Sequence, residues 1–248
     1  MELALGKLQR LCERLGTGLL SGFHFRKNAH LYTEQIYRAG VQSTWIVVFC
    51  LAFLSVLMVV ELSIHMKLVL RQDSLVPAFS SVLMLRELGP VVACLLLTSR
   101  VGAAMGAEIG MMKNTEQLDA LRVLGMDPVE YLVLPRWFAG VVASVCLSVF
   151  AVAVAILCGA GIASLELGIS GQQYMQSMFL FVRGIDGATC LVKALVFGTI
   201  MPLVACREGF RCGPGSVGVG TAATSAVVRG AIGIIIADFA VSYFMQRL

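Results

Sequence analysis

Five long apolar stretches, separated by short polar segments, dominate this chain of 248 residues. A helix that crosses a bilayer needs about 20 mostly apolar residues. Hydrophobic residues make up 58% of the chain and charged residues 14%, whereas a soluble domain has about 25% charged residues. The sequence therefore predicts an all-α polytopic membrane protein with about five transmembrane helices. These helices are expected over about Val41–Ile64, Leu88–Gly110, Arg136–Ser164, Gly187–Cys206 and Thr221–Met245.

The remaining segments are predicted to connect or flank these spans. Lys67–Arg86 is mixed in character and contains Pro77, so we expect a connector with a half-helix rather than a sixth span. A short helix around Tyr174–Phe181 is expected within the polar segment Leu165–Asp186. Met1–Leu20 lacks the apolar core and cleavage site of a signal peptide. Its leucines recur at helical spacing opposite basic residues, which predicts an amphipathic helix on an anionic membrane surface.

The lysine and arginine residues predict the orientation, because cytoplasmic loops carry an excess of them. An N-terminus in the cytoplasm places eleven on that side and five on the other, with three within or at the edge of spans. The cytoplasmic group is Lys7, Arg10, Arg14, Arg26, Lys27, Arg38, Lys113, Arg122, Arg136, Arg207 and Arg211. The opposite group is Lys67, Arg71, Arg86, Arg183 and Arg247.

A polar segment between the second and third spans predicts a separate short helix over Thr115–Leu124. Asn114 is expected to cap its start, with Gln117 completing a pair like that of a capping box, and Gly125 is expected to end it. Such a helix could rest on the bilayer or dock a cytoplasmic partner, and spacing alone does not decide between them. Its polar side chains are Glu116, Gln117, Asp119 and Arg122.

The second span combines a glycine stripe with charged residues. Its GxxxGxxxG motif, which allows close helix packing, consists of Gly102, Gly106 and Gly110. Arg100 and Glu108 fall on the other side of this helix. Because a charge inside the membrane normally faces protein or water, we expect a polar cavity or an intramembrane ion pair at Arg100 and at Lys193. Asp238 is a candidate partner, and Glu108 could equally be an interfacial carboxylate near the end of the span.

Motifs of several enzyme classes are missing from the sequence. There is no GxxxxGK[ST], HExxH or GxSxG motif. Most cysteines lie in apolar runs, where cysteine behaves as a small hydrophobe, and no metal-ligand spacing is present. We therefore expect no catalytic residues, no metal and no ATP site on this chain.

The central block resembles the permeases of the MlaE/YrbE family, the membrane subunits of Mce-type lipid ABC transporters. It reads LRELGPVVACLLLTSRVGAAMGAEIGMMKNTEQLDALRVLGMDPVEYLVLPR, from Leu85 to Arg136. Two further segments, Phe25–Ser43 and Gly209–Val228, match the family pattern. The resemblance covers nearly all of the chain after about Gly22.

The resemblance implies partners and residue roles. The permease would be a homodimer in the inner membrane, with a pair of cytoplasmic ATPase subunits that hold ATP and magnesium, and an Mce-domain protein on the far side. The TEQLDAL helix would enter a groove of the ATPase, which makes Glu116, Gln117, Asp119 and Arg122 its expected contacts. The residues expected around a phospholipid cavity between the protomers, lined by the first, second and fifth spans, are Arg100, Glu108 and Lys193.

The chain departs from the family pattern at two positions near the start of the fifth span, and it is divided into two regions. Thr221 and Ser225 stand where the family commonly has basic residues, so the sequence leaves open whether that turn keeps a phosphate-anchoring or docking role. Residues 1–40 are assigned to the N-terminal interfacial and cytoplasmic helices, and residues 41–248 to the permease domain.

Two other functions are compatible with the residues alone. The first is an ion-coupled secondary transporter that uses Arg100, Glu108 and Asp238 in a proton relay. The second is a membrane anchor that holds an Mce-domain protein without transporting lipid.

Overall fold

The computed structural model describes residues 29–69, 75–245 and 247. Every element within these ranges is a helix, and none of the described residues forms a strand. Five helices are long and apolar enough to cross a membrane, so the predicted all-α polytopic fold is confirmed. The amphipathic helix predicted for Met1–Leu20 lies outside the described residues.

The second membrane helix is much longer than its apolar stretch predicts. It runs without a break over Val76–Asn114, so the segment expected to be a connector belongs to this helix from Val76 onward. The prediction of a helix start near Leu88 is therefore wrong, although no sixth span appears in the described part. Pro90 has no N–H to donate, and the turn before it widens into a π-helix, which lets the helix continue. Its successive elements are α5 (Val76–Leu83), η3 (Met84–Leu88), α6 (Gly89–Leu97), η4 (Thr98–Gly102) and α7 (Ala103–Asn114).

The other elements follow the predicted order of spans and short helices. The predicted helix near Tyr174–Phe181 is present as α10. The first span comprises α3 (Ala29–Ala39), η1 (Val41–Ser43) and α4 (Thr44–Val69). The short helix after α7 is α8 (Gln117–Val123), and the third span comprises η5 (Val129–Val133) and α9 (Leu134–Glu166). The remainder are α10 (Gly171–Phe181), α11 (Gly184–Phe210) and α12 (Gly215–Met245).

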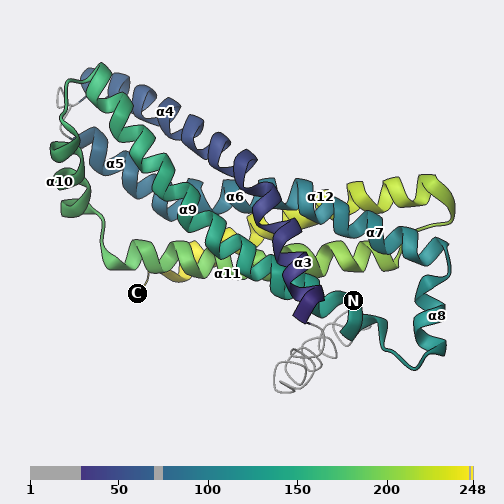
Figure 1. Ribbon diagram of the computed structural model, residues 1–248. Helices are drawn as coiled ribbons and strands as arrows, with labels where there is room; N and C mark the ends of the chain where they lie inside the picture. The colour runs from purple at the N-terminus through teal and green to yellow at the C-terminus, as the bar shows by residue number, and fades with distance from the viewer. Residues whose placement is uncertain (1–28, 70–74, 246, 248) are drawn as a thin grey trace.

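The long helices run back and forth between two ends of the molecule (Figure 1). One end carries α8, the end of α7 and the α11–α12 connection, and we call it the α8 end. The other carries α10, which packs beside α5 and α9, and we call it the α10 end. α4 and α9 pack along each other, while α7, α11 and α12 form a second group. This alternation places the start of α4 nearer the α8 end and the end of α12 at the α10 end.

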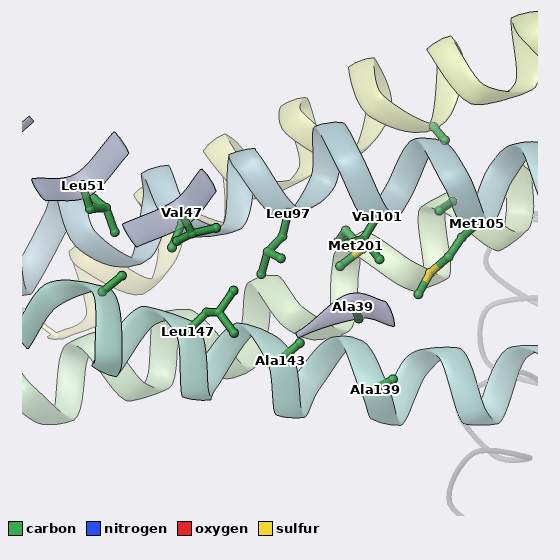
Figure 2. Close-up of a cluster of buried hydrophobic side chains, with 14 of the residues drawn as sticks. Ala39, Val47, Leu51, Leu97, Val101, Met105, Ala139, Ala143, Leu147 and Met201 are labelled. Carbon is green, nitrogen blue, oxygen red and sulfur yellow. The ribbon is translucent and has the colours of Figure 1, made fainter. Parts of the chain in front are cut away.

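Small side chains allow the helices of the main core to approach one another closely. Along α9, Ala139, Ala143 and Ala151 lie on one face, four and eight residues apart with Leu147 between the last two, and are almost fully buried. They share one buried cluster with larger residues of neighbouring helices, such as Val47 and Leu97, and Figure 2 shows part of this cluster. Because this face of α9 offers small residues to its neighbours, backbones come close, and van der Waals packing in the membrane becomes favourable.

The glycine stripe of α7 faces α11 and α12. A Cβ atom on Gly106 would lie 3.0 Å from the Ala226 Cβ atom, and one on Gly110 would lie 3.0 Å from the Cys212 sulfur. A Cβ atom on Gly102 would lie 3.5 Å from Thr98 and 3.6 Å from Met201. The tightest contacts of the stripe are therefore at Gly106 and Gly110, near the α8 end.

The two C-terminal helices differ sharply in how much of their surface the rest of the chain covers. The most apolar part of α11 is 56% buried, whereas that of α12 is only 11% buried. Large apolar side chains such as Ile236 and Phe239 are exposed along α12. This protein is therefore a multi-pass membrane protein in which α12 presents most of its apolar surface to lipid or to another chain.

Candidate functional site

A fully buried lysine lies at the centre of a charged cluster in the α10-end half of the bundle. The ammonium of Lys193, on α11, is 2.5 Å from a carboxylate oxygen of Glu87 and 2.7 Å from one of Asp238. The hydroxyl of Ser242 donates to Glu87 at 3.2 Å. A buried charge is tolerated when it is paired and hydrogen-bonded, so the two carboxylates stabilise the lysine. An intramembrane ion pair was one of the two surroundings expected for Lys193, and Asp238, a candidate partner, is one of the two carboxylates that it meets.

Three separate helices supply this cluster. Glu87 lies in the π-helical segment η3, where the wider turn accommodates Pro90, and Asp238 lies on α12. The cluster thus ties the poorly covered helix α12 to the middle of the bundle. Glu87 and Asp238 side chains remain 35% and 24% exposed, whereas Lys193 is fully buried. The part of the cluster that is exposed on the surface of this chain therefore consists of the two carboxylates.

A second ion pair lies at the start of α11, near the same end. Arg86 is 3.5 Å from a carboxylate oxygen of Asp186, which is itself buried. The other oxygen of Asp186 accepts the backbone N–H of Arg183 at 2.8 Å. Asp186 therefore both satisfies a free N–H at the helix start and holds α11 against the second helix.

Arg100 has neutral partners in the described part of the chain. Its guanidinium donates to the backbone carbonyl of Gln42 and, at 3.0 Å, to the hydroxyl of Ser43. Both partners lie at the junction between α3 and α4, so Arg100 fastens that junction to the second helix. The side chain is largely exposed, which leaves further N–H groups accessible. No ion pair of Arg100 is seen among the described residues, and its place in a polar cavity stays a prediction.

Glu108 is shared by two arginines at the α8 end. One carboxylate oxygen lies 3.0 Å from Arg136, whose side chain is buried, and the other lies 3.3 Å from Arg38. Arg38 also pairs with Glu34 one helical turn earlier, at 2.6 Å. These contacts join α3, α7 and the start of α9. The three residues expected around one cavity, Arg100, Glu108 and Lys193, thus have separate sets of partners.

The short helix α8 begins later than predicted and without the predicted cap. Asn114 is still part of α7, and its side-chain amide donates to the Gly215 carbonyl at 3.1 Å. The residue before α8 is Glu116, whose backbone is left-handed with φ of 59° and whose side chain makes no capping bond. The predicted roles of Asn114 and Gln117 as a capping pair are therefore wrong, because the α11–α12 connection engages Asn114.

The end of α8 follows the prediction. Gly125 has φ of +75°, which glycine adopts without strain. Its N–H donates to the Arg122 carbonyl, and the next N–H, of Met126, donates to Leu121, both at 3.0 Å. This pair of bonds is a Schellman motif. It closes α8 and directs the chain back toward α9.

α8 projects from the bundle (Figure 1), and its polar side chains are exposed. Leu118 is buried and anchors the helix. Asp119 and Arg122 pair at 2.8 Å with both side chains well exposed, and Val123 is 87% exposed. The surface of α8 is therefore free in this protomer, as a docking helix requires, and the contacts assigned to its exposed polar residues stay predictions. These exposed polar residues are Glu116, Gln117, Asp119 and Arg122.

The base of α8 is held rigidly to the α11–α12 connection. Besides the Asn114 bond, the ammonium of Lys113 donates to the Cys212 carbonyl at 2.7 Å. Both residues lie in the last turn of α7, directly before α8. A force on α8 would therefore reach α7 and α12 together.

Sequence reasoning missed several charged contacts. They include Glu87 with Lys193, Arg86 with Asp186, both arginines around Glu108, and a pair between Glu208 and Arg229 at 2.6 Å. Glu208 is buried, and its second carboxylate oxygen has no hydrogen-bond partner among the described residues. The only available signal was that a charge within an apolar stretch needs a partner of opposite sign. That rule identifies Glu87 and Glu208 as candidates but does not pair them.

A comparison with protein families supports the same interpretation of the fold. The family described as permease MlaE matches residues 32–244. The match includes all five candidate membrane helices from α3 to α12.

Several known proteins are similar to parts of this chain. A probable ABC transporter permease of Rickettsia typhi is 40% identical over 66% of this chain and 63% of its own length. The chloroplastic protein TRIGALACTOSYLDIACYLGLYCEROL 1 of Arabidopsis thaliana is 39% identical over 64% of this chain and 45% of its own length. The matched region therefore spans less than two thirds of either relative. A probable ABC transporter permease of Pyropia yezoensis is 30% identical over 88% of this chain and 82% of its own length. From the family match and this coverage, we conclude that the chain belongs to the MlaE permease family.

Proposed function

We propose that this permease is the membrane subunit of an ATP-driven Mce-type transporter that moves phospholipids or related lipids. Lipid would pass between the inner membrane and an Mce-domain partner, with ATP and magnesium bound by a separate cytoplasmic ATPase. The name of the Arabidopsis relative, which contains that of a diacylglycerol lipid, supports a lipid substrate. The observation that carries the proposal is α8, an exposed polar helix fastened to the two helices that would move.

The proposed mechanism starts at α8. ATPase closure would push on this helix, and the bonds of Lys113 and Asn114 to the α11–α12 connection would pass the movement to α7 and α12. α12 would move relative to α11, and this movement would have to break the ion pairs of the cluster of Glu87, Lys193 and Asp238 that link the two helices. In this proposal the cluster holds α12 in one of two positions, as alternating access requires.

In the proposed homodimer, the second protomer would pack against α12. Its exposed side chains Val228, Ile232, Ile235 and Phe239 recur at three- and four-residue spacing. Arg229, half exposed beside them, would be costly against lipid tails and is better placed against protein or a water-filled cavity. A cavity between two copies would offer apolar walls to acyl chains and charged groups to the head group.

The lysine/arginine distribution favours a cytoplasmic α8 end. Arg38, Lys113, Arg122 and Arg136 lie at this end among the described residues, whereas Arg86 and Arg183 lie toward the α10 end. Positively charged ends of membrane helices face the cytoplasm. The ATPase would then meet α8 on the side where ATP is available.

The docking role is tested by reversing charge on α8. In Glu116→Lys and Asp119→Lys, we expect at least about tenfold weaker binding of the ATPase, equivalent to about 1.4 kcal/mol. The new lysines would repel any positive groups of the groove that contact the native carboxylates. Binding is measured by co-purification, and coupling by the transfer of fluorescent phospholipid per ATP hydrolysed in reconstituted vesicles.

The matched control is Glu166→Lys, an exposed carboxylate at the far end of α9. It should leave the complex and its coupling unchanged. An intact, fully coupled complex in both α8 variants would refute docking through α8. Lipid transfer that needs an ion gradient and no ATP would instead support the secondary transporter.

A further inference from the structure

A pocket of about 510 Å³ opens at the α8 end, between α3, α7, the base of α8 and the η5–α9 junction. Its charged lining residues are Arg38, Glu108 and Arg136. Glu108 points away from the glycine stripe of α7, which packs against α11 and α12. The pocket therefore lies on the opposite side of α7 from α12, outside the cavity proposed between two protomers.

The guanidinium of Arg136 is buried in this wall but incompletely bonded. One terminal nitrogen pairs with Glu108 at 3.0 Å and the other donates to the Leu132 carbonyl at 3.0 Å. Its Nε atom is buried and has no hydrogen-bond partner among the described residues. Because a buried donor is normally satisfied, this arginine keeps hydrogen-bonding capacity that the described residues leave unused. Arg38 adds a second guanidinium that is half exposed.

The charges around the pocket are balanced. Arg38 and Arg136 contribute two positive charges, and Glu34 and Glu108, which pair with them, contribute two negative charges. A ligand with net charge would leave an uncompensated charge in a partly buried site, which is unfavourable. A zwitterionic ligand would leave the balance intact, with its phosphate on the arginines and its amine on a carboxylate.

The rest of the lining contains both apolar and polar side chains. Met111, Met112 and Leu132 supply apolar surface, while Gln35 and Tyr131 supply polar groups. A small soluble anion would use only part of such a surface. An amphiphile would use all of it, with the head group near the arginines and the start of its chains on the methionines.

The position of the pocket along the helices fits a membrane interface. The second helix has 39 residues and is therefore about 58 Å long, whereas the hydrocarbon core is only about 30 Å thick. Part of this helix must lie outside the hydrocarbon core. Glu108 and Met111 lie near its α8 end, where head groups of the adjacent leaflet are available.

We propose that this pocket binds a phospholipid with a phosphoethanolamine head group, from the leaflet at the α8 end. Its phosphate accepts hydrogen bonds from Arg136 and Arg38, since guanidinium forks match phosphate geometry. Its ammonium donates to Glu108, which a trimethylated choline cannot match. The bound lipid bridges α3, α7 and α9 beside α8, and this site is independent of the transported lipid.

The test uses the full chain in nanodiscs and phospholipids that carry a diazirine at the start of one acyl chain. After illumination, mass spectrometry measures label on the peptide that contains Met111 and Met112. We expect phosphatidylethanolamine to label this peptide at least about fivefold more than phosphatidylcholine or phosphatidylglycerol. Arg136→Gln should reduce this label to background, whereas Arg122→Gln, on the exposed face of α8, should leave it unchanged.

A second variant separates loss of the site from loss of the fold. Met112→Trp keeps every charge and fills the pocket, so it should also abolish the label while the thermal unfolding temperature stays close to that of the native chain. Equal labelling by all three lipids, or labelling that survives both Arg136→Gln and Met112→Trp, would overturn the proposal. Absence of label from every lipid would also overturn it, because the pocket would then hold no lipid in the membrane.

Water-soluble glycerophosphoethanolamine distinguishes a lipid site from a site for a free phosphate ester. It carries the same head group without acyl chains. At millimolar concentration it should leave labelling by phosphatidylethanolamine unchanged. Complete competition would show that the head group alone is sufficient and would refute the lipid assignment.

Discussion

At the scale of single residues, buried charge is what most distinguishes this protein from a plain bundle of apolar helices. Lys193 is completely buried, and its stabilisation depends on Glu87 and Asp238, which lie on different helices. Glu108 is surrounded in the same way by Arg38 and Arg136. Each charge is tolerated because its partners come from other segments, so each contact also fixes how those segments are arranged.

Removing the ammonium of Lys193 should therefore be costly. In Lys193→Met, two carboxylates would face each other without a cation, and we expect a loss of about 3 kcal/mol in the free energy of unfolding. The measurement is thermal unfolding of the purified protein in detergent or nanodiscs. Arg122→Ala, which breaks an exposed pair on α8, should change the unfolding temperature little.

A compensating variant checks the cause. Adding Glu87→Gln and Asp238→Asn to Lys193→Met removes the uncompensated charges and should recover much of the lost stability. If Lys193→Met alone unfolds at the native temperature, the cluster does not stabilise the fold as described.

The sequence predicted some of these residues but not their arrangement. It indicated that Lys193 needs a partner and that Asp238 was available, and the two do pair. Glu87 could not be assigned to Lys193, which is 106 positions away, because the pairing depends on how the second helix packs against α11. Arg38 and Arg136 were assigned only to the cytoplasmic side, since lysine/arginine counts carry no information on which carboxylate they meet.

At the scale of elements, apolar length predicted the number of spans well and their ends poorly. The second helix was expected to start near Leu88 but starts at Val76, because packing against α4 and α10 supports the earlier turns. At its other end, Asn114 was expected to cap a new helix, yet its amide binds the Gly215 carbonyl. In both places, contacts with distant segments outweighed a valid local preference.

Close helix packing at the α9–α11 contact gives a prediction for one glycine. A Cβ atom on Gly198 would lie 2.0 Å from the Ser144 hydroxyl and 3.0 Å from the Val141 backbone. Gly198→Ala should therefore separate α9 from α11 and destabilise the protein by about 1–3 kcal/mol, as measured by thermal unfolding.

The matched control is Gly161→Ala on the same helix pair. Gly161 lies in α9, and nothing lies within 4 Å of an added Cβ atom. Alanine favours helix over glycine by about 1 kcal/mol, so this variant should be neutral or slightly more stable. Equal destabilisation by both substitutions would show that the Gly198 contact is not specific.

At the scale of the whole molecule, five spans among the described residues put the start of α3 and the end of α12 on opposite sides of the membrane. The end of α12 lies at the α10 end, whereas α3 begins toward the α8 end (Figure 1). We expect green fluorescent protein fused before Met1 to fluoresce, because that side is proposed to be cytoplasmic. Alkaline phosphatase fused after Leu248 should be active, because the enzyme matures only outside the cytoplasm. If neither fusion is active, the orientation is the reverse of the one proposed. If the two reporters place both ends on the same side of the membrane, the number of spans is even and the five-span topology is contradicted.

The π-helical segments in the second helix have a consequence for the angular phase of its residues. Each residue of an α-helix advances the side chain by about 100°, and a π-helical turn holds an additional residue. The segments Met84–Leu88 and Thr98–Gly102 therefore reset the direction of all side chains that follow them. A single-residue deletion in the second segment would rotate Gly106 and Gly110 away from α12 and turn Glu108 from its arginines. The deletion would leave the mean hydropathy of this helix almost unchanged. It would nevertheless rotate the second half of the helix relative to the first half.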